Sequence, residues 1–151
     1  MAARVSHACM PARARGTVAR MTTRRAACSC GKLVITCDGE PVRVSVCHCL
    51  ACQRRTGSAF GVQARYPRDR VEGLEQGKAY TRVADSGNEV TFRFCPECGS
   101  TIAWELHALP GFVAIAVGAL ADPSFVAPKI SIYEARRFPW VEIRGEVEHL
   151  D

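Results

Sequence analysis

The sequence predicts a mainly β single domain with short helical turns. Short segments rich in β-branched and aromatic residues alternate with turn-forming residues, which is the pattern of a chain built from strands. The chain has 151 residues, of which 48% are hydrophobic and 23% are charged, and this composition suits one folded core. Seven of the nine cysteines gather in three clusters beside glycines or at the ends of predicted strands.

Residues 1–25 differ from the rest of the chain and are predicted to form a disordered, Arg-rich tail. They contain six arginines and no acidic side chain, and Met21 offers a second plausible start. An Arg-rich organelle presequence and an artefact of start-site choice are the alternatives. The domain is therefore expected to span residues 26–151. Its 14 basic and 15 acidic side chains leave no broad basic surface for nucleic acid.

The first part of the domain reads as a hairpin that leads into a cysteine cluster. A β-branched strand is predicted over residues 32–37, followed by the turn 38–41. In residues 42–46, valines alternate with polar residues, so this strand buries one face and ends at Cys47.

A short helical turn is predicted next, because residues 49–55 lack helix breakers and Gly57 offers a stop. Residues 85–88 form the turn of a second hairpin. The segment 95–99, Cys-Pro-Glu-Cys-Gly, has the form of a zinc knuckle. The remaining strands are expected at residues 59–66, 79–84, 90–94, 101–106, 112–117 and 130–133.

The cysteine clusters indicate metal thiolates in a reducing compartment, and hence a cytoplasmic protein, because no secretory apolar run precedes them. Seven cysteines can supply one four-thiolate zinc site and one three-thiolate site with an open position. Spacing alone does not decide the pairing, although the dyads Cys28/Cys30 and Cys95/Cys98 would complete one tetrahedron. In the alternative, Cys37 fills the open position and both sites are structural.

In the first arrangement the second ion is held by Cys47, Cys49 and Cys52, and the intervening His48 is expected to support the site or to be exposed rather than to bind the metal. Three thiolates give a zinc ion a formal charge of −1, which disfavours activation of water. Such a site suits a fourth sulfur, held as the thiolate that attacks electrophilic carbon. The three cysteines are therefore the predicted catalytic residues.

A thiol cosubstrate with carboxylates would need donors beside this site. Gln53, Arg54 and Arg55 follow directly in sequence and are predicted to bind it.

Three motifs resemble the glutathione-dependent formaldehyde-activating enzyme family, which shares its domain with centromere protein V. They are Cys28-Ser-Cys30-Gly, Cys47-His-Cys49-x-x-Cys52 with the following Gly57-Ser58, and Phe94-Cys95-x-x-Cys98-Gly-Ser. The resemblance extends over residues 27–140.

The resemblance implies a β-tent zinc fold with two zinc ions. A structural ion would bind Cys28, Cys30, Cys95 and Cys98, and glutathione would approach a second ion on the other three clustered cysteines. The implied activity is that of a carbon-sulfur lyase, S-(hydroxymethyl)glutathione synthase-like, which adds the glutathione thiol to formaldehyde or a related small aldehyde, or catalyses the reverse reaction.

The alternative function is a non-catalytic zinc module, acting as a thiol-adduct carrier or a protein-interaction domain. Neither function involves nucleic acid or a membrane. The longest nearly apolar stretch, residues 112–121, is shorter than the roughly 18 residues that a membrane-spanning helix needs.

Overall fold

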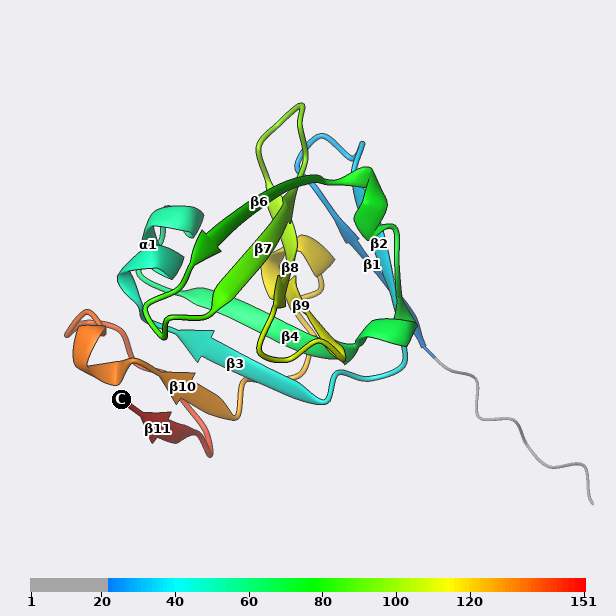
Figure 1. Ribbon diagram of the computed structural model, residues 1–151. Helices are drawn as coiled ribbons and strands as arrows, with labels where there is room; N and C mark the ends of the chain where they lie inside the picture. The colour runs from blue at the N-terminus through cyan, green and yellow to red at the C-terminus, as the bar shows by residue number, and fades with distance from the viewer. Residues whose placement is uncertain (1–21) are drawn as a thin grey trace, which may run out of the picture.

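Eight strands form one large sheet in the computed structural model, which describes residues 22–151 (Figure 1). They are β3 (Arg43–Cys47), β4 (Gly61–Pro67), β6 (Lys78–Val83), β7 (Glu89–Phe94), β8 (Thr101–Leu106), β9 (Phe112–Ala116), β10 (Ile130–Ile132) and β11 (Glu148–Leu150). Their order across the sheet is β11-β10-β3-β4-β9-β8-β7-β6. Pairing is antiparallel except at β10, which runs parallel to both of its neighbours.

A second sheet of three strands packs against one face of the large sheet (Figure 1). It consists of β1 (Thr23–Ala27), β2 (Val34–Asp38) and β5 (Val71–Glu72), paired antiparallel in that order. On β2, the alternate residues Ile35 and Cys37 are fully buried. They join a core cluster that includes Ala26, Leu33, Val44, Ala64, Tyr66, Val71, Leu74, Ile102, Ala103, Val113 and Ile115. The two sheets thus enclose the main hydrophobic core.

Helical structure is confined to short segments. The one α-helix among the described residues is α1 (Leu50–Thr56), which is capped by Cys49 at its start and ends at the predicted stop, Gly57. No helix in residues 22–151 has the length and apolarity needed to cross a membrane. The 3-10 segments are η1 (Arg68–Arg70), η2 (Leu74–Gln76), η3 (Val117–Leu120) and η4 (Glu134–Arg136). The prediction of a mainly β domain with short helical turns is confirmed.

The predicted hairpin of residues 32–37 and 42–46 is wrong. Strand β2 pairs with β1 and β5, whereas β3 pairs with β4 and β10. The turn at residues 38–41 therefore carries the chain from one sheet to the other. A turn signal marks a change of direction, but it does not fix which strand becomes the neighbour.

The predicted tail, residues 1–25, includes residues at its C-terminal end that belong to the folded domain. Residues 23–25 belong to β1. In this strand Arg24 Nη2 donates to both carboxylate oxygens of Glu40, at 2.8 and 2.9 Å. Arg24 also lies over the Phe125 ring, 5.1 Å from its centroid. The remainder of the predicted tail, residues 1–21, lies outside the described residues.

The face of the large sheet that points away from the main core carries the second cysteine cluster. Alternate residues Arg43, Ser45 and Cys47 share this face of β3. It continues across the sheet to Trp104 on β8 and Phe92 on β7, whose ring centroids are 6.0 Å apart. The cysteines thus lie at the strand end of a surface lined by arginine and aromatic side chains.

Candidate metal centres and the adjoining cavity

The first cysteine group joins two turns that are distant in sequence. The turn after β1 supplies Cys28 and Cys30, and the turn between β7 and β8 supplies Cys95 and Cys98. The four sulfur atoms lie within 4.8 Å of one another. Two of the Sγ–Sγ separations are 3.5 and 3.7 Å, close to the roughly 3.8 Å edge of a tetrahedron with zinc–sulfur bonds of about 2.3 Å. The donor set and its spacing fit a zinc ion.

Backbone and hydroxyl donors favour the thiolate at two of the four cysteines, Cys28 and Cys98. At Cys30, a backbone hydrogen bond from Lys32 does not offset the Cys28 thiol and burial, which raise the pKa of Cys30 to about 12. Burial opposes ionisation of Cys28, but hydrogen bonds from the Leu33 amide and neighbouring thiols outweigh it and lower the Cys28 pKa. Hydrogen bonding to Ser100 lowers the pKa of Cys98 to about 5. The Ser29 and Ser100 hydroxyl oxygens lie 2.9 Å apart and link the two turns directly.

The second group is built where β3 runs into α1. Cys47 is the last residue of β3, Cys49 caps the helix, and Cys52 lies in its first turn. Their sulfur atoms lie within 4.8 Å of one another, and the Cys52 amide donates to Cys49 Sγ at 3.4 Å. Hydrogen bonds with the Cys47 and Cys52 thiols lower the pKa of Cys49 to about 2. Three sulfurs in this arrangement can hold zinc and leave one tetrahedral position open.

Cys37 does not belong to either group. It is fully buried in the main core, and burial raises the pKa of its thiol to about 12. The structure therefore gives no support to the alternative in which Cys37 fills the open position.

A small cavity of about 170 Å³ opens directly onto the second group. Its walls include Phe92 and Trp104 of the sheet and Tyr133, which follows β10. Tyr133 has φ of 60°, a left-handed conformation that is uncommon for a side chain of this size. Burial and the nearby Cys47 and Cys49 thiols raise the pKa of its phenol, so the hydroxyl stays protonated at neutral pH.

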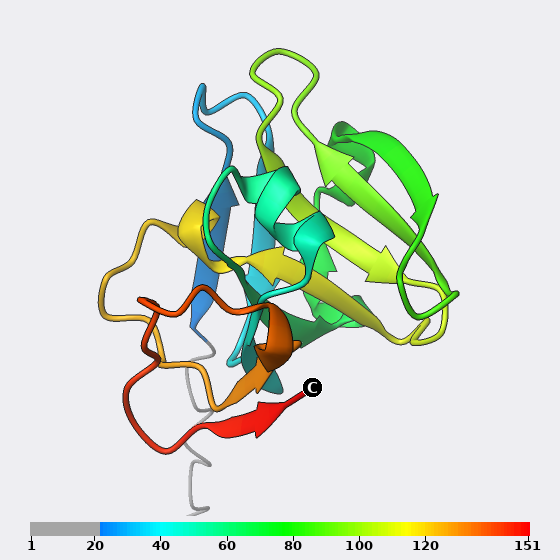
Figure 2. The ribbon, with the colours of Figure 1, turned by 90° about the vertical axis from the view of Figure 1, so that its left-hand side faces the viewer.

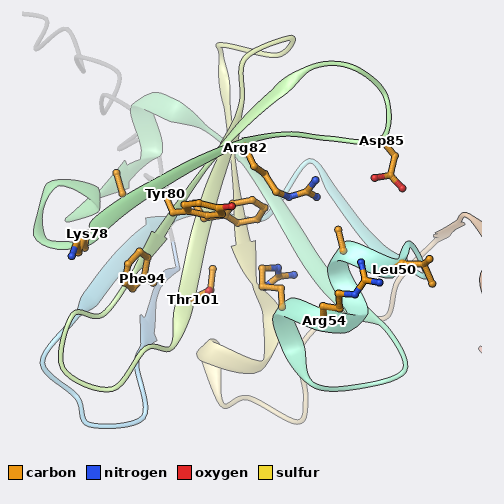
Figure 3. A pocket seen from close by; sticks show the side chains of 12 residues that line it. Leu50, Arg54, Lys78, Tyr80, Arg82, Asp85, Phe94 and Thr101 are labelled. Atoms are coloured by element: carbon orange, nitrogen blue, oxygen red, sulfur yellow. The ribbon is translucent and has the colours of Figure 1, made fainter.

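A larger cavity of about 930 Å³ adjoins the small one, and both are lined by Arg82, Asp85 and Phe92. Figure 3 shows Tyr80 and Arg82 of β6 on one side of this cavity and Arg54 of α1 on the other. Through the residues that line both, the larger cavity adjoins the one that contains the second cysteine group. Its cationic and aromatic lining suits an acidic organic molecule.

The three predicted cosubstrate-binding residues lie on α1 but have different surroundings. Arg54 and Arg55 line the larger cavity, and the Arg55 guanidinium lies 4.3 Å from the centroid of the Trp104 ring. Gln53 does not line either of these cavities. Its amide nitrogen donates to the carbonyls of His48 and Arg136, at 2.8 and 3.1 Å. Both amide hydrogens are therefore engaged within the protein.

A polar network that is buried at His48 and Ser131 and reaches the surface at Arg137 and His149 adjoins the second group. His48 is fully buried, which excludes the exposed alternative, and its Nε2 lies 3.0 Å from Ser131 Oγ on β10. Glu134 accepts hydrogen bonds from Arg137 Nε at 2.6 Å and from His149 Nδ1 at 2.8 Å. Figure 2 shows α1 beside this C-terminal segment, with β10, η4 and β11 in orange to red.

Sequence reasoning did not identify Ser131, Glu134 or Tyr133 as parts of the site. The segment that carries them meets β3 only because β10 pairs with it in parallel, in a register that places Ile132 opposite Cys47. Nothing in the local pattern of the sequence indicates that pairing.

Comparisons with known proteins agree with this architecture. The model of the family described as glutathione-dependent formaldehyde-activating enzyme matches residues 23–136, a range that includes both cysteine groups. The crystal structure of a Rhodobacter sphaeroides protein is similar with a TM-score of 0.51 and 20% sequence identity. That similarity covers 66% of this chain and 91% of the other, and at this identity it shows the fold alone.

Proposed function

The chain belongs to the glutathione-dependent formaldehyde-activating enzyme family, and on that premise we propose that it is a zinc-dependent, carbon-sulfur lyase-like enzyme. It would add the thiol of glutathione to formaldehyde or a related small aldehyde, or catalyse the reverse reaction. The observation that carries the proposal is the group of three cysteines, Cys47, Cys49 and Cys52, which faces a cavity and has no fourth protein ligand within residues 22–151.

The two cysteine groups have different roles in this proposal. Four thiolates, from Cys28, Cys30, Cys95 and Cys98, would hold a structural zinc. The three-thiolate group would hold a second zinc, which supplies a position where a visiting sulfur is kept as thiolate near neutral pH. Thiolate ligands need reducing conditions, so the proposal includes a cytoplasmic location.

The protein's own residues would position the reactants and donate the proton that the aldehyde oxygen needs. Arg54 and Arg55 lie where they can bind the carboxylates of glutathione in the larger cavity. Phe92 and Trp104 present apolar walls that restrict water near the thiolate. Tyr133 lines the same small cavity, and its hydroxyl is the proposed proton donor to the oxygen of the aldehyde.

The bond changes are few. The thiolate sulfur forms a bond to the aldehyde carbon while the carbon–oxygen π bond breaks and its electron pair moves to oxygen. The thiol proton leaves to solvent when the thiolate forms. The developing alkoxide takes the phenolic proton of Tyr133, and solvent returns a proton to Tyr133, so no proton is gained or lost overall. The product is a hydroxymethyl thioether, and no oxidant or reductant is consumed. Positioning and one proton donor suffice because the aldehyde carbon is strongly electrophilic.

The first test is the rate of adduct formation with Cys52→Ser. We expect the rate above the uncatalysed reaction of glutathione with formaldehyde to vanish, because a hydroxyl is a poor zinc ligand in place of a thiolate. The matched control is Cys37→Ala, which removes a thiol outside both groups and should leave the rate per folded molecule unchanged. An undiminished rate with Cys52→Ser would refute the proposal.

The non-catalytic zinc module remains the second candidate, because the same open group and cavity would also suit a thiol-adduct carrier. A carrier would bind glutathione or its adduct without accelerating its formation. The rate measurement on the unmodified protein therefore separates the two functions.

A further inference from the structure

Two arginines lie side by side at the far end of the small cavity. Arg43 of β3 and Arg65 of β4 are directly opposite each other in the strand register (the two strands are adjacent in Figure 1). Both are half-buried, and both line the cavity that contains the second cysteine group. They share the sheet face of Cys47, which ends β3 four residues after Arg43.

This pair is unfavourable in the absence of an anion. Like charges directly opposite each other on neighbouring strands repel. Within residues 22–151, neither guanidinium has a carboxylate within ion-pair distance, and Arg43 Nε is buried without a hydrogen-bond acceptor. Burial, together with the charge of Arg43, lowers the pKa of Arg65. The fold thus keeps two cations together at a cost in free energy.

The acidic residue that lines the same cavity does not neutralise them. Asp85 binds Arg136 instead, with its Oδ2 2.5 Å from Arg136 Nη1. Arg82 adds a third guanidinium to the cavity wall. Between the arginine pair and the cysteines, Gln63 Nε2 donates to Ser45 Oγ at 3.1 Å, so this part of the floor has its own polar partners. Arg82 donates to the Val83 carbonyl at 2.8 Å and lies over the Phe92 ring. Arg43 and Arg65 are thus two adjacent half-buried cations that have no acidic partner among the described residues.

The distance between the arginine pair and the cysteines indicates how long a molecule must be to contact both. Four residues of strand separate the Cα atoms of Arg43 and Cys47 by about 13 Å, and an extended arginine side chain shortens the remaining gap by several ångströms. A molecule of a few bonds' length can therefore have its reacting atom at the cysteines and a carboxylate at the arginines.

We propose that Arg43 and Arg65 form a carboxylate-binding subsite for the molecule that occupies the Cys47–Cys49–Cys52 cavity. The carboxylate belongs either to the thiol cosubstrate or to an aldehyde that itself carries an acid group. What reacts at the cysteine end rests on the proposed function. The anion subsite can be tested independently of it.

The test is calorimetric titration of the full-length protein with two probes. S-methylglutathione carries the carboxylates of glutathione but cannot present a thiolate, and glycolate represents a small acidic aldehyde. We expect Arg43→Gln and Arg65→Gln each to weaken binding about tenfold, because each removes a charge-assisted hydrogen bond. Arg70→Gln, on the exposed η1 segment outside the cavity, is the matched control and should bind like the unmodified protein.

The probe that the arginine variants no longer bind tightly identifies the source of the carboxylate. Loss of S-methylglutathione affinity assigns the subsite to the thiol, and loss of glycolate affinity assigns it to the aldehyde. Thermal unfolding of the ligand-free variants supplies a second readout: removing a like-charge pair should leave the melting temperature unchanged or raised, whereas arginines with a merely structural role would lower it.

Either of two results would overturn the proposal: no detectable binding of either probe to the unmodified protein, or equal affinities of both probes for the double variant and for Arg70→Gln. Cys52→Ser should keep its affinity for S-methylglutathione within about twofold, since the methylated sulfur does not need a metal-bound thiolate. Failure of the enzyme proposal would therefore appear in the rate measurement, and failure of the subsite would appear in these titrations.

Discussion

Cys49 illustrates how one residue can serve both folding and chemistry. Its backbone is extended, its side chain accepts the Cys52 amide hydrogen, and helix α1 begins at the next residue. A thiolate at this position satisfies one of the free amides at the start of a helix. The same contact holds the Cys49 sulfur against the helical turn that carries Cys52.

Tyr133 is the residue for which the proposed chemistry makes the sharpest prediction. Replacing it with phenylalanine keeps the ring in the cavity but removes the proposed proton donor. We expect Tyr133→Phe to slow adduct formation about a hundredfold, the typical contribution of a positioned general acid. The measurement is the initial rate at saturating glutathione.

The phenylalanine variant should retain its metal content and its affinity for S-methylglutathione, which separates a chemical role from a structural one. Tyr80→Phe is the matched control, because Tyr80 lines the larger cavity and not the small one, so its loss can change the affinity for glutathione but not the rate at saturating glutathione. Equal rates for Tyr133→Phe and this control would remove Tyr133 from the mechanism.

The cysteines could be identified from the sequence because each cluster is local: two or three ligands fall within a few residues. Tyr133 and the Arg43–Arg65 pair could not. Tyr133 lies more than 80 residues after the cysteines it faces, and the arginines become neighbours only through the register of β3 and β4. Such contacts depend on strand pairing, which the alternation of residues within one strand does not specify.

At the scale of elements, helix α1 depends on the C-terminal segment for its position. Gln53 of the helix donates to the Arg136 carbonyl of η4, and Glu134 of η4 binds Arg137 and His149. His149 belongs to β11, so this network joins the helix, η4 and the edge of the large sheet.

This network predicts a pH dependence of stability. Burial opposes ionisation of Glu134, but hydrogen bonds from Ser131, His149 and Arg137 outweigh it and lower its pKa from 4.5 to about 2. A carboxyl group whose pKa is lowered by folding stabilises the protein above pH 4.5 and loses this contribution as the pH falls toward 2. The lost contribution is about 1–3 kcal/mol.

Glu134→Gln should remove this part of the pH dependence. We expect the variant to be less stable than the unmodified protein at pH 6, and the difference in unfolding free energy to shrink between pH 4.5 and about 2. Urea unfolding across this range measures it. Both proteins contain the same cysteines, so acid release of metal cancels in the difference. A difference that stays constant with pH would contradict the assignment.

Elements built from local signals were predicted well, and those that depend on distant partners were not. The hairpin of β6 and β7 follows from alternation and its turn, and β8 has the predicted bounds of residues 101–106. Strand β1 was missed because its arginines resemble those of the preceding segment, whereas its place in the sheet comes from pairing with β2. Strand β11 is short and exposed and forms only through its contact with β10.

At the scale of the whole molecule, one cysteine group links the two sheets and the other lies at a strand end beside a cavity. The first group joins the β1–β2 turn to the β7–β8 turn, and so ties the small sheet to the large one. The second group lies at the end of β3 on the face turned away from the core. A closed group that links two sheets suits a structural ion, whereas a three-donor group beside a cavity suits an exchangeable ligand.

The most direct test of this account is the zinc content of the purified full-length protein, measured by mass spectrometry of the released metal. We predict about two zinc ions per chain, falling to about one in a Cys47→Ser variant that keeps its folded circular dichroism spectrum. About one zinc ion per chain in both proteins, or an unchanged content of about two in the variant, would contradict a metal centre on Cys47, Cys49 and Cys52.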